Sequence, residues 1–79
     1  MTLTELKAKI AANEDVTGVD TSNIVDMSGL FSKNTTFNQD ISAWNVSNVT
    51  KMNGMFYKAE NFNQDISGWN VSKVKEMCT

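Results

Sequence analysis

An eleven-residue segment that occurs twice constrains the fold of this chain more than any other feature. Residues 37–47 are FNQDISAWNVS, and residues 62–72 are FNQDISGWNVS. Ten of the eleven positions are identical, and the remaining one exchanges Ala43 for Gly68. Two such segments 25 residues apart indicate a repeat architecture, in which each unit packs mainly against its neighbours.

The 25-residue period extends beyond this segment. Residues 15–19 align with residues 40–44 and 65–69. Apolar positions later in the unit recur at the same spacing: Ile24, Val49 and Val74; Met27, Met52 and Met77; Phe31 and Phe56. A chain of 79 residues forms a single domain. We divide it into an N-terminal capping helix at residues 1–14, a degenerate first unit at 15–39, a second unit at 40–64 and an incomplete third unit at 65–79.

Residues 2–13 are predicted to form an amphipathic helix. Thr2 and Glu5 have the spacing of a capping box, in which each side chain accepts a hydrogen bond from the backbone of the other residue. The apolar side chains at helical spacing are Leu3, Leu6 and Ile10. Because a repeat array exposes core at its ends, we expect this helix to cover the first unit.

Each unit is predicted to contain a short strand and a helix. Residues 16–18, 41–43 and 66–68 combine an aliphatic residue with two small ones, a pattern that favours a strand with close neighbours. Residues 24–33 and 49–58 carry apolar side chains at helical spacing. Parallel strands joined by right-handed crossovers would form an α/β fold, namely a short right-handed leucine-rich-repeat-like solenoid of strand–loop–helix units.

Stacking of equal units would place equivalent side chains above one another. The expected pairs are Phe31 and Phe56, Phe37 and Phe62, Ile41 and Ile66, and Trp44 and Trp69. We expect each strand to end or bulge where the tryptophan turns inward. Asn38 and Asn63 are expected to form a ladder that holds adjacent corners through their side-chain amides.

The Gln-Asp pairs within the repeat allow two interpretations. Gln39-Asp40 and Gln64-Asp65 could act as ligands or as catalytic carboxylates. They could instead stabilise a repeated corner. Acid catalysis needs a partner group that separates the pKa values of the two carboxyls, and the repeat supplies only copies of the same carboxylate. We therefore favour the structural interpretation.

The composition argues against an enzyme or a metalloprotein. The chain has no histidine and a single cysteine, Cys78, so it offers neither a zinc-ligand set nor a base beside the thiol. We expect Cys78 to be a frayed, exposed thiol near the end of the chain. No Gly-rich phosphate loop and no calcium loop are present. We therefore expect no catalytic residues, no metal and no cofactor.

Two classes of partner are also disfavoured. The seven lysines are dispersed and the net charge is −2, whereas nucleic-acid binding requires a concentrated basic face. No apolar run reaches the roughly 18 residues of a membrane span. The first residues show no signal peptide, so the sequence leaves a cytoplasmic location open.

The candidate interaction face consists of Thr17, Ser42 and Ser67. These hydroxyl residues alternate with the aliphatic positions of the predicted strands and would line the outer face of the sheet. Repeat proteins bind partners along such extended surfaces. The alternative is a solvated face that has no partner.

The repeat resembles that of a large bacterial family. Its order is Phe-Asn-Gln-Asp-Ile-Ser-x-Trp-Asn-Val-Ser, followed by Val, Met and Met-Phe at fixed spacing. This order is similar to the repeat of BspA-like and mycoplasma-type surface lipoproteins, a domain of unknown function related to leucine-rich repeats. The resemblance covers residues 15–77. It implies a leucine-rich-repeat-like solenoid on a surface or secreted protein, a role in adhesion, and no enzyme activity.

Two functional hypotheses follow. In the first, the chain is a non-enzymatic module that presents a surface to a host or bacterial surface protein or to a glycan, as an adhesion-type part of a bacterial surface protein. In the second, it is a structural spacer or a self-associating fragment without a ligand of its own. End-to-end self-association is expected if an uncovered edge pairs with another copy.

Overall fold

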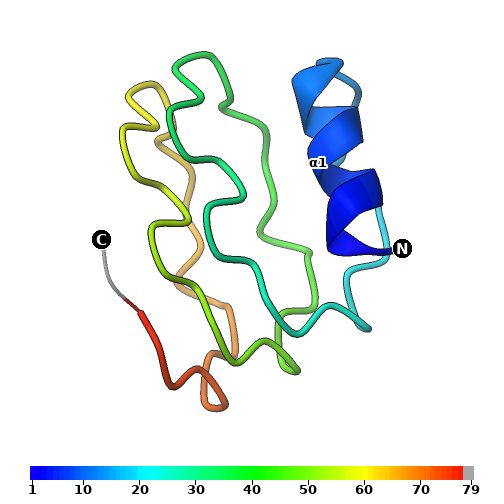
Figure 1. The fold of residues 1–79 in the computed structure, drawn as a ribbon, viewed down its shortest axis with the longest axis vertical. Coiled ribbons are helices and arrows are strands. Elements are labelled where there is room, and N and C mark those ends of the chain that lie inside the picture. The colour runs from blue at the N-terminus through cyan, green and yellow to red at the C-terminus, as the bar shows by residue number, and fades with distance from the viewer. Residues whose placement is uncertain (78–79) are drawn as a thin grey trace.

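The computed structural model describes residues 1–77, and Cys78, the thiol expected to be exposed, lies outside the described residues. The chain begins with α1 (Leu3–Ala11), followed by irregular, looping coils (Figure 1). In Figure 1, α1 lies at one side of the molecule and the last described residues lie at the opposite side.

The N-terminal helix forms as the sequence predicts, with slightly shorter bounds. The backbone N–H of Thr2 donates to Glu5 Oε1 at 3.0 Å, and the N–H of Glu5 donates to Thr2 Oγ1 at 3.2 Å. This capping box satisfies N–H groups that have no partner within the helix. Leu6 and Ile10 are buried against the coils, and Leu3 is partly buried. The predicted capping box and apolar face are confirmed.

The predicted α/β solenoid of strand–loop–helix units is wrong. Within residues 1–77, α1 is the only helix, and no strand longer than a single bridge forms. Parallel pairing is limited to isolated bridges between Asp26 and Lys51 and between Lys51 and Glu76. The molecule is a small globule of coils and turns.

In the segments predicted to be helical, residues 24–33 and 49–58, some backbone N–H groups donate to a neighbouring unit. Others donate within their own unit, three residues back. Alternate N–H groups of the first unit donate to carbonyls of the second at 2.6–3.0 Å. The donor and acceptor pairs are Met27 and Lys51, Gly29 and Asn53, Phe31 and Met55, and Lys33 and Tyr57. The intervening N–H groups of Leu30, Ser32 and Asn34 donate three residues back. An α-helix cannot form because half of its donors are used by the neighbouring unit.

Left-handed backbone conformations also interrupt these segments. Gly29 has a φ of 70° and Gly54 a φ of 62°, while Lys33 and Lys58 have φ values of 61° and 56°. Such values do not occur within an α-helix. The apolar spacing that suggested a helix instead arises from successive tight turns, which point about every third side chain inward.

The predicted short strands are turns. The N–H of Trp44 donates to the carbonyl of Ile41 at 3.1 Å, and Trp69 repeats this bond to Ile66. The aspartate before each turn accepts a hydrogen bond from the N–H two residues further on. This is the Asx turn that Asp-x-Ser and Asp-x-Thr sequences favour. The tryptophan turns inward as predicted, but a turn rather than a strand bulge directs it.

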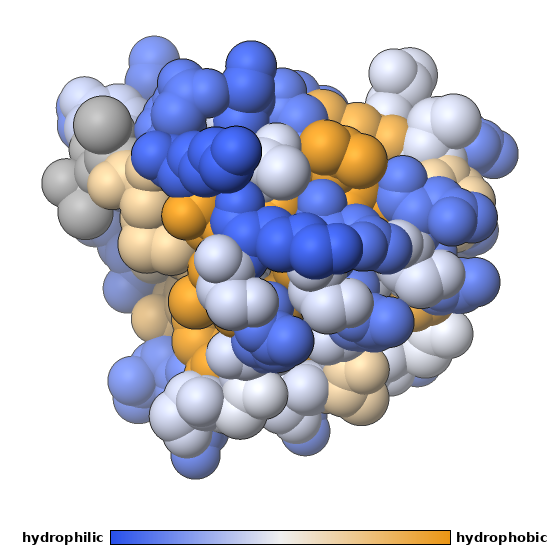
Figure 2. All heavy atoms as spheres, turned by 90° about the horizontal axis from the view of Figure 1, so that it is seen from below, coloured by the Kyte–Doolittle hydropathy of each residue, from blue (hydrophilic) through white to orange (hydrophobic). Residues whose placement is uncertain are grey.

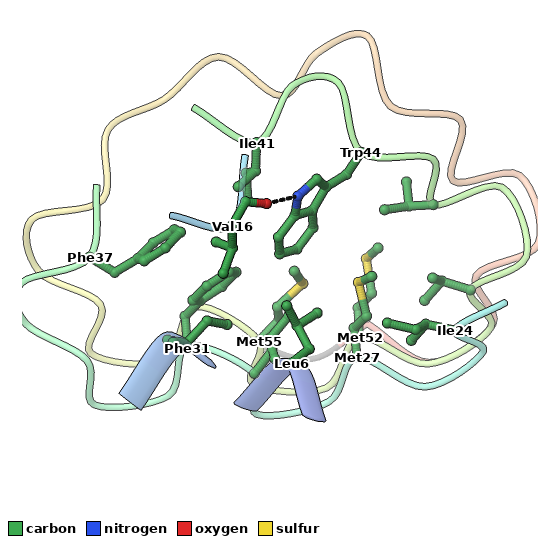
Figure 3. Packing of buried hydrophobic residues seen from close by; sticks show 14 residues of the cluster. Leu6, Val16, Ile24, Met27, Phe31, Phe37, Ile41, Trp44, Met52 and Met55 are labelled. Carbon is green, nitrogen blue, oxygen red and sulfur yellow. Dashed lines mark hydrogen bonds between the residues drawn. The ribbon is translucent and has the colours of Figure 1, made fainter. Parts of the chain in front are cut away.

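The core lies inside the coils, and side chains of α1 contribute to it (Figure 3). It consists of apolar side chains from α1 and the first two units, together with partly buried ones from the third. Figure 3 shows the rings of Phe31 and Phe37 pointing into this core with the sulfur-bearing side chains of Met27, Met52 and Met55. Methionine is suited to the irregular spaces between unequal coils.

Aromatic rings stack between units, as the repeat predicted. The ring centroids of Trp44 and Trp69 are 6.4 Å apart at an interplanar angle of 4°. Phe31 and Phe56 are 5.5 Å apart, and Phe37 and Phe62 are 6.1 Å apart. The expected aromatic pairs are therefore confirmed, although residues 15–77, which carry them, contain neither strand nor helix.

Candidate interaction surface

The three predicted site residues occupy equivalent turns rather than a sheet face. Thr17 is half-buried, and Ser42 and Ser67 are exposed. The N–H of each donates to the aspartate two residues earlier, at 2.9, 3.0 and 2.9 Å, respectively. The Thr17 hydroxyl also donates to Asp15, at 2.7 Å. Because no sheet forms, the outer sheet face expected to carry these residues is absent from the described part of the chain.

Hydrogen bonds at these turns lower the pKa of the aspartates below their ordinary value of 3.8. For Asp40 and Asp65 the larger cause is the serine hydroxyl and the smaller is the serine N–H. For Asp15 the N–H of Thr17 contributes most. The Thr17 hydroxyl is thus engaged with its own carboxylate, at 2.7 Å, which reduces its capacity to donate to a ligand.

The Gln-Asp pairs hold the backbone together, as the structural interpretation predicted. Gln39 Oε1 accepts from the N–H of Val16 at 2.9 Å, and its Nε2 donates to the carbonyl of Glu14 at 2.9 Å. Gln64 Nε2 donates to the carbonyl of Asn38, also at 2.9 Å. A general acid at neutral pH requires a raised pKa, whereas the carboxyl pKa values in these turns are lowered.

Asn38 links two corners of the repeat through its side chain. Its Oδ1 accepts a 2.8 Å hydrogen bond from the N–H of Asn63 and a 3.1 Å bond from Gln64 Nε2. The predicted contact between the equivalent asparagines therefore exists, although both residues are exposed rather than buried.

Figure 2 shows that the face seen there is mostly hydrophilic, with apolar side chains visible between polar ones.

A different surface of the described residues is concave and coincides with only one of the predicted hydroxyl positions. It is an open apolar groove of about 680 Å³, which we call the end groove. Its lining includes Met55, Phe56, Tyr57, Trp69 and Met77. Ser67, one of the predicted site residues, lies on its wall, whereas Thr17 and Ser42 do not line it.

Loss of burial from the second unit to the third explains this groove. Ile41 and Trp44 are 0% and 4% exposed, while their equivalents Ile66 and Trp69 are only partly buried. The increase in exposure is larger for the residues that follow the tryptophan in each unit. Exposure rises from 2% at Val46 to 37% at Val71, and from 5% at Met52 to 59% at Met77. The second unit is covered by the third, and nothing in the described structure covers the third.

Two exposed pairs involve charged side chains of the second and third units, and one of these side chains, Lys58, lines the end groove. Lys51 Nζ lies 3.6 Å from Glu76 Oε2. Lys58 Nζ lies 5.3 Å from the ring centroid of Tyr57, within the range of a cation–π contact. Both pairs are exposed to solvent, so they contribute little to stability. Lys58 places a positive charge in the lining of this apolar groove.

The end groove was not predicted from the sequence. Val71 and Met77 line it, and their apolar character is visible in the sequence, but their exposure is not. The candidate face was instead placed on hydroxyl residues, because a sheet was expected. An interaction surface at an edge was expected only for self-association.

No group of three metal-ligating side chains converges within residues 1–77. No helix in the same part of the chain combines the length and apolar character of a membrane span. No curated protein and no solved structure matched the chain. One family, described as "Mycoplasma protein of unknown function, DUF285", matches residues 2–79. The chain belongs to this family.

Proposed function

We propose that this chain is a non-enzymatic interaction module that binds a protein partner through the end groove. The observation that supports the proposal is the exposed apolar groove of about 680 Å³ on a domain of only 79 residues. Apolar surface of this kind on a small protein marks sites of interaction. Burial of Trp69, Tyr57 and Met77 by a partner would supply the driving force for binding.

The lining of the groove favours a protein over a glycan. Methionine side chains adapt to different apolar surfaces, and tryptophan and tyrosine are enriched among the residues that dominate binding energy at protein interfaces. Specific recognition of a polar ligand requires several placed hydrogen-bonding groups. The groove walls are mainly apolar, with Ser67 and Lys58 as polar members.

The adhesion-type role on a bacterial surface protein, implied by the resemblance to surface lipoproteins, is part of this proposal. It predicts that the protein is accessible from outside the cell. Protease treatment of intact cells of the organism that encodes it, followed by detection of the repeat with an antibody, tests this location. Degradation only after lysis would contradict it.

The binding function can be tested without knowing the partner, by selection from a phage-displayed peptide library. The immobilised full chain should enrich peptides that bind with saturation in solution. Tyr57→Asp and Met77→Asp place a charge in the groove at exposed positions (44% and 59%), so the fold should be retained. Each change should weaken the selected peptides at least tenfold, because a charge in an apolar interface is desolvated without a partner.

Ser42→Lys is the matched control, because Ser42 is exposed and lies outside the groove. It should leave binding of the selected peptides unchanged. Loss of binding in Ser42→Lys alone would assign recognition to the hydroxyl positions predicted from the sequence. A glycan array tested in parallel reports whether the partner is a carbohydrate. Failure to enrich any groove-dependent ligand from a folded chain would contradict the proposal and favour the spacer hypothesis.

A further inference from the structure

Extension of the hydrogen-bond pattern of the first two units by one unit places one backbone donor and one backbone acceptor on the outer edge of the third unit. In the first two units, the N–H groups of Met27 and Met52 donate to the next unit, to Lys51 and Glu76, respectively. Met77 is the next equivalent of these two methionines. By the same repeat geometry, its N–H is directed away from the second unit.

The acceptor follows from the same comparison. The carbonyl of Val25 accepts from Thr50 at 2.7 Å, and the carbonyl of Thr50 accepts from Lys75 at 2.8 Å. The carbonyl of Lys75 is the next in this series. The edge therefore offers an acceptor and a donor on either side of Glu76, which is the arrangement that receives an additional extended segment.

The charges along this row alternate. Asp26 pairs by a parallel bridge with Lys51, and Lys51 pairs with Glu76. The row is therefore acidic, basic and acidic, with an ion pair of 3.6 Å between Lys51 and Glu76. Opposite charges at directly facing positions stabilise strand pairing, and like charges destabilise it. The residue that faces Glu76 from outside should accordingly be basic.

We infer that the edge of the third unit binds an extended peptide segment in parallel register, with a lysine or arginine facing Glu76 and large apolar side chains covering the end groove. The inference rests on the proposed function and specifies the chemistry of the partner. Backbone hydrogen bonds would supply the register, and the groove would supply apolar contact. When a peptide adds to the edge of a sheet, backbone hydrogen bonds generally supply the affinity and side-chain contacts supply the specificity.

The molecule itself contains a template for the pairing at Glu76, in a segment that pairs with the first unit through a single parallel bridge at Lys51 and forms turns elsewhere. Residues 41–58 lie against the first unit, and they place Lys51 opposite Asp26 and Trp44 within the core. They also receive the N–H donors of four first-unit residues. A segment of this pattern therefore matches an edge that ends in an acidic residue.

A second copy of the folded chain fits the edge less well. A two-fold arrangement would place Glu76 opposite Glu76 of the other copy. A head-to-tail arrangement would bring Glu76 to Asp26, next to the start of α1. Both juxtapose like charges, which disfavours pairing.

The test uses a synthetic peptide of residues 41–58, labelled with fluorescein, and the full chain as receptor. Fluorescence anisotropy should show saturable binding. A peptide with Lys51→Glu should bind about fivefold more weakly, because attraction to Glu76 becomes repulsion. In the receptor variant Glu76→Gln, the two peptides should bind within about twofold of each other. Glu76 is exposed, so this variant should fold normally.

Amide hydrogen exchange distinguishes edge pairing from unspecific apolar capture. Binding of the peptide should slow exchange of the Met77 amide, because that N–H gains an acceptor. Equal affinity of the unaltered peptide and its Lys51→Glu variant, or an unchanged Met77 amide in the bound state, would overturn the inference. Sedimentation of the chain alone should give a monomer, and a dimer blocked by Met77→Asp would assign the edge to a second copy instead.

These outcomes separate the two proposals. If library-selected peptides bind the groove and the residue 41–58 peptide does not, the inference about the partner fails and the proposed function stands. If neither the selected peptides nor this peptide binds a folded chain, both fail.

Discussion

The indole N–H of Trp44 donates a 2.8 Å hydrogen bond to the backbone carbonyl of Val16 (Figure 3). The two residues belong to successive units and are both buried. Trp69 repeats the contact one unit later, to the carbonyl of Ile41 at 3.1 Å. Each tryptophan therefore packs against the core and also donates to a backbone carbonyl of the preceding unit, so one side chain joins two units by apolar contact and by hydrogen bonding.

Truncation of Trp44 should destabilise the chain far more than truncation of Trp69. Trp44→Ala removes a buried aromatic side chain and should cost about 3–5 kcal/mol, which is comparable to the total stability of a small domain. Trp69→Ala should cost less, because Trp69 is only partly buried. Urea unfolding followed by circular dichroism measures both.

Trp44→Phe is the control for the hydrogen bond. It retains an aromatic ring but removes the indole donor, which leaves the Val16 carbonyl with only the longer, 3.4 Å bond from the Val19 N–H. The lost hydrogen bond should cost roughly 1 kcal/mol. Equal stability of the Trp44→Ala and Trp69→Ala variants would contradict the burial gradient between the second and third units.

Glycine substitutions should separate the turns that require a left-handed backbone from those that do not. Gly29 has a φ of 70°, so Gly29→Ala should destabilise the fold by about 1–2 kcal/mol. Gly18 has no positive φ, and a methyl group there would meet nothing within 4 Å. Gly18→Ala should therefore be neutral or stabilising by up to about 1 kcal/mol. Thermal unfolding of the two variants should give opposite or clearly different shifts in Tm.

Replacement of Gln39 by glutamate should test the side-chain bridge from Gln39 to Glu14 and Val16, in the segment that follows α1. The change keeps an acceptor for the Val16 N–H, but it removes the donor to the carbonyl of Glu14 and places a carboxylate beside it. A loss of roughly 1–2 kcal/mol is expected from the unmatched acceptors. Gln39→Glu should recover stability at low pH when its carboxyl is protonated, relative to Gln39→Ala. Identical pH profiles for the two variants would argue against this bridge.

Acid should destabilise the fold through the Asx turns. Folding lowers the carboxyl pKa of the turn aspartates at positions 15, 20, 26, 40 and 65. Between the folded and unfolded pKa values, the unfolded chain binds more protons. The stabilisation is therefore complete above the unfolded value near 3.8 and is lost as the pH falls through the lowered values.

Denaturant unfolding at a series of pH values from about 7 down to about 2 checks this dependence. The variant Asp40→Asn provides the control, because asparagine can form the same turn without titrating. Its stability should fall less steeply with acid than that of the parent chain. A parent stability that rises below about pH 4 would contradict the assignment.

The sequence predicted contacts more successfully than it predicted conformation. The period of the repeat was sufficient to pair Trp44 with Trp69 and Phe37 with Phe62, because stacking of equivalent residues follows from any regular repeat. The capping box at Thr2 was also predictable, because it depends on local spacing alone.

The apolar spacing could not distinguish a helix from a series of tight turns, because both place apolar side chains inward at about every third position. Residues 24–33 place apolar side chains about every third position, as a helix does, but Gly29 and Lys33 adopt left-handed conformations and the N–H groups turn to the next unit. The Asp-x-Ser pattern could have indicated turns in place of strands. The end groove depends on which surface remains uncovered, and local sequence does not report that.

Burial that decreases from the second unit to the third has a consequence for how the molecule opens. With Ile66 and Trp69 only partly covered, release of the third unit disrupts fewer buried contacts than global unfolding does. Local stability should therefore decline along the chain from α1 towards residue 77. A ligand at this edge would use part of its binding free energy to hold the third unit in place. Its apparent affinity would then report the order of that unit as well as the contacts that the ligand makes.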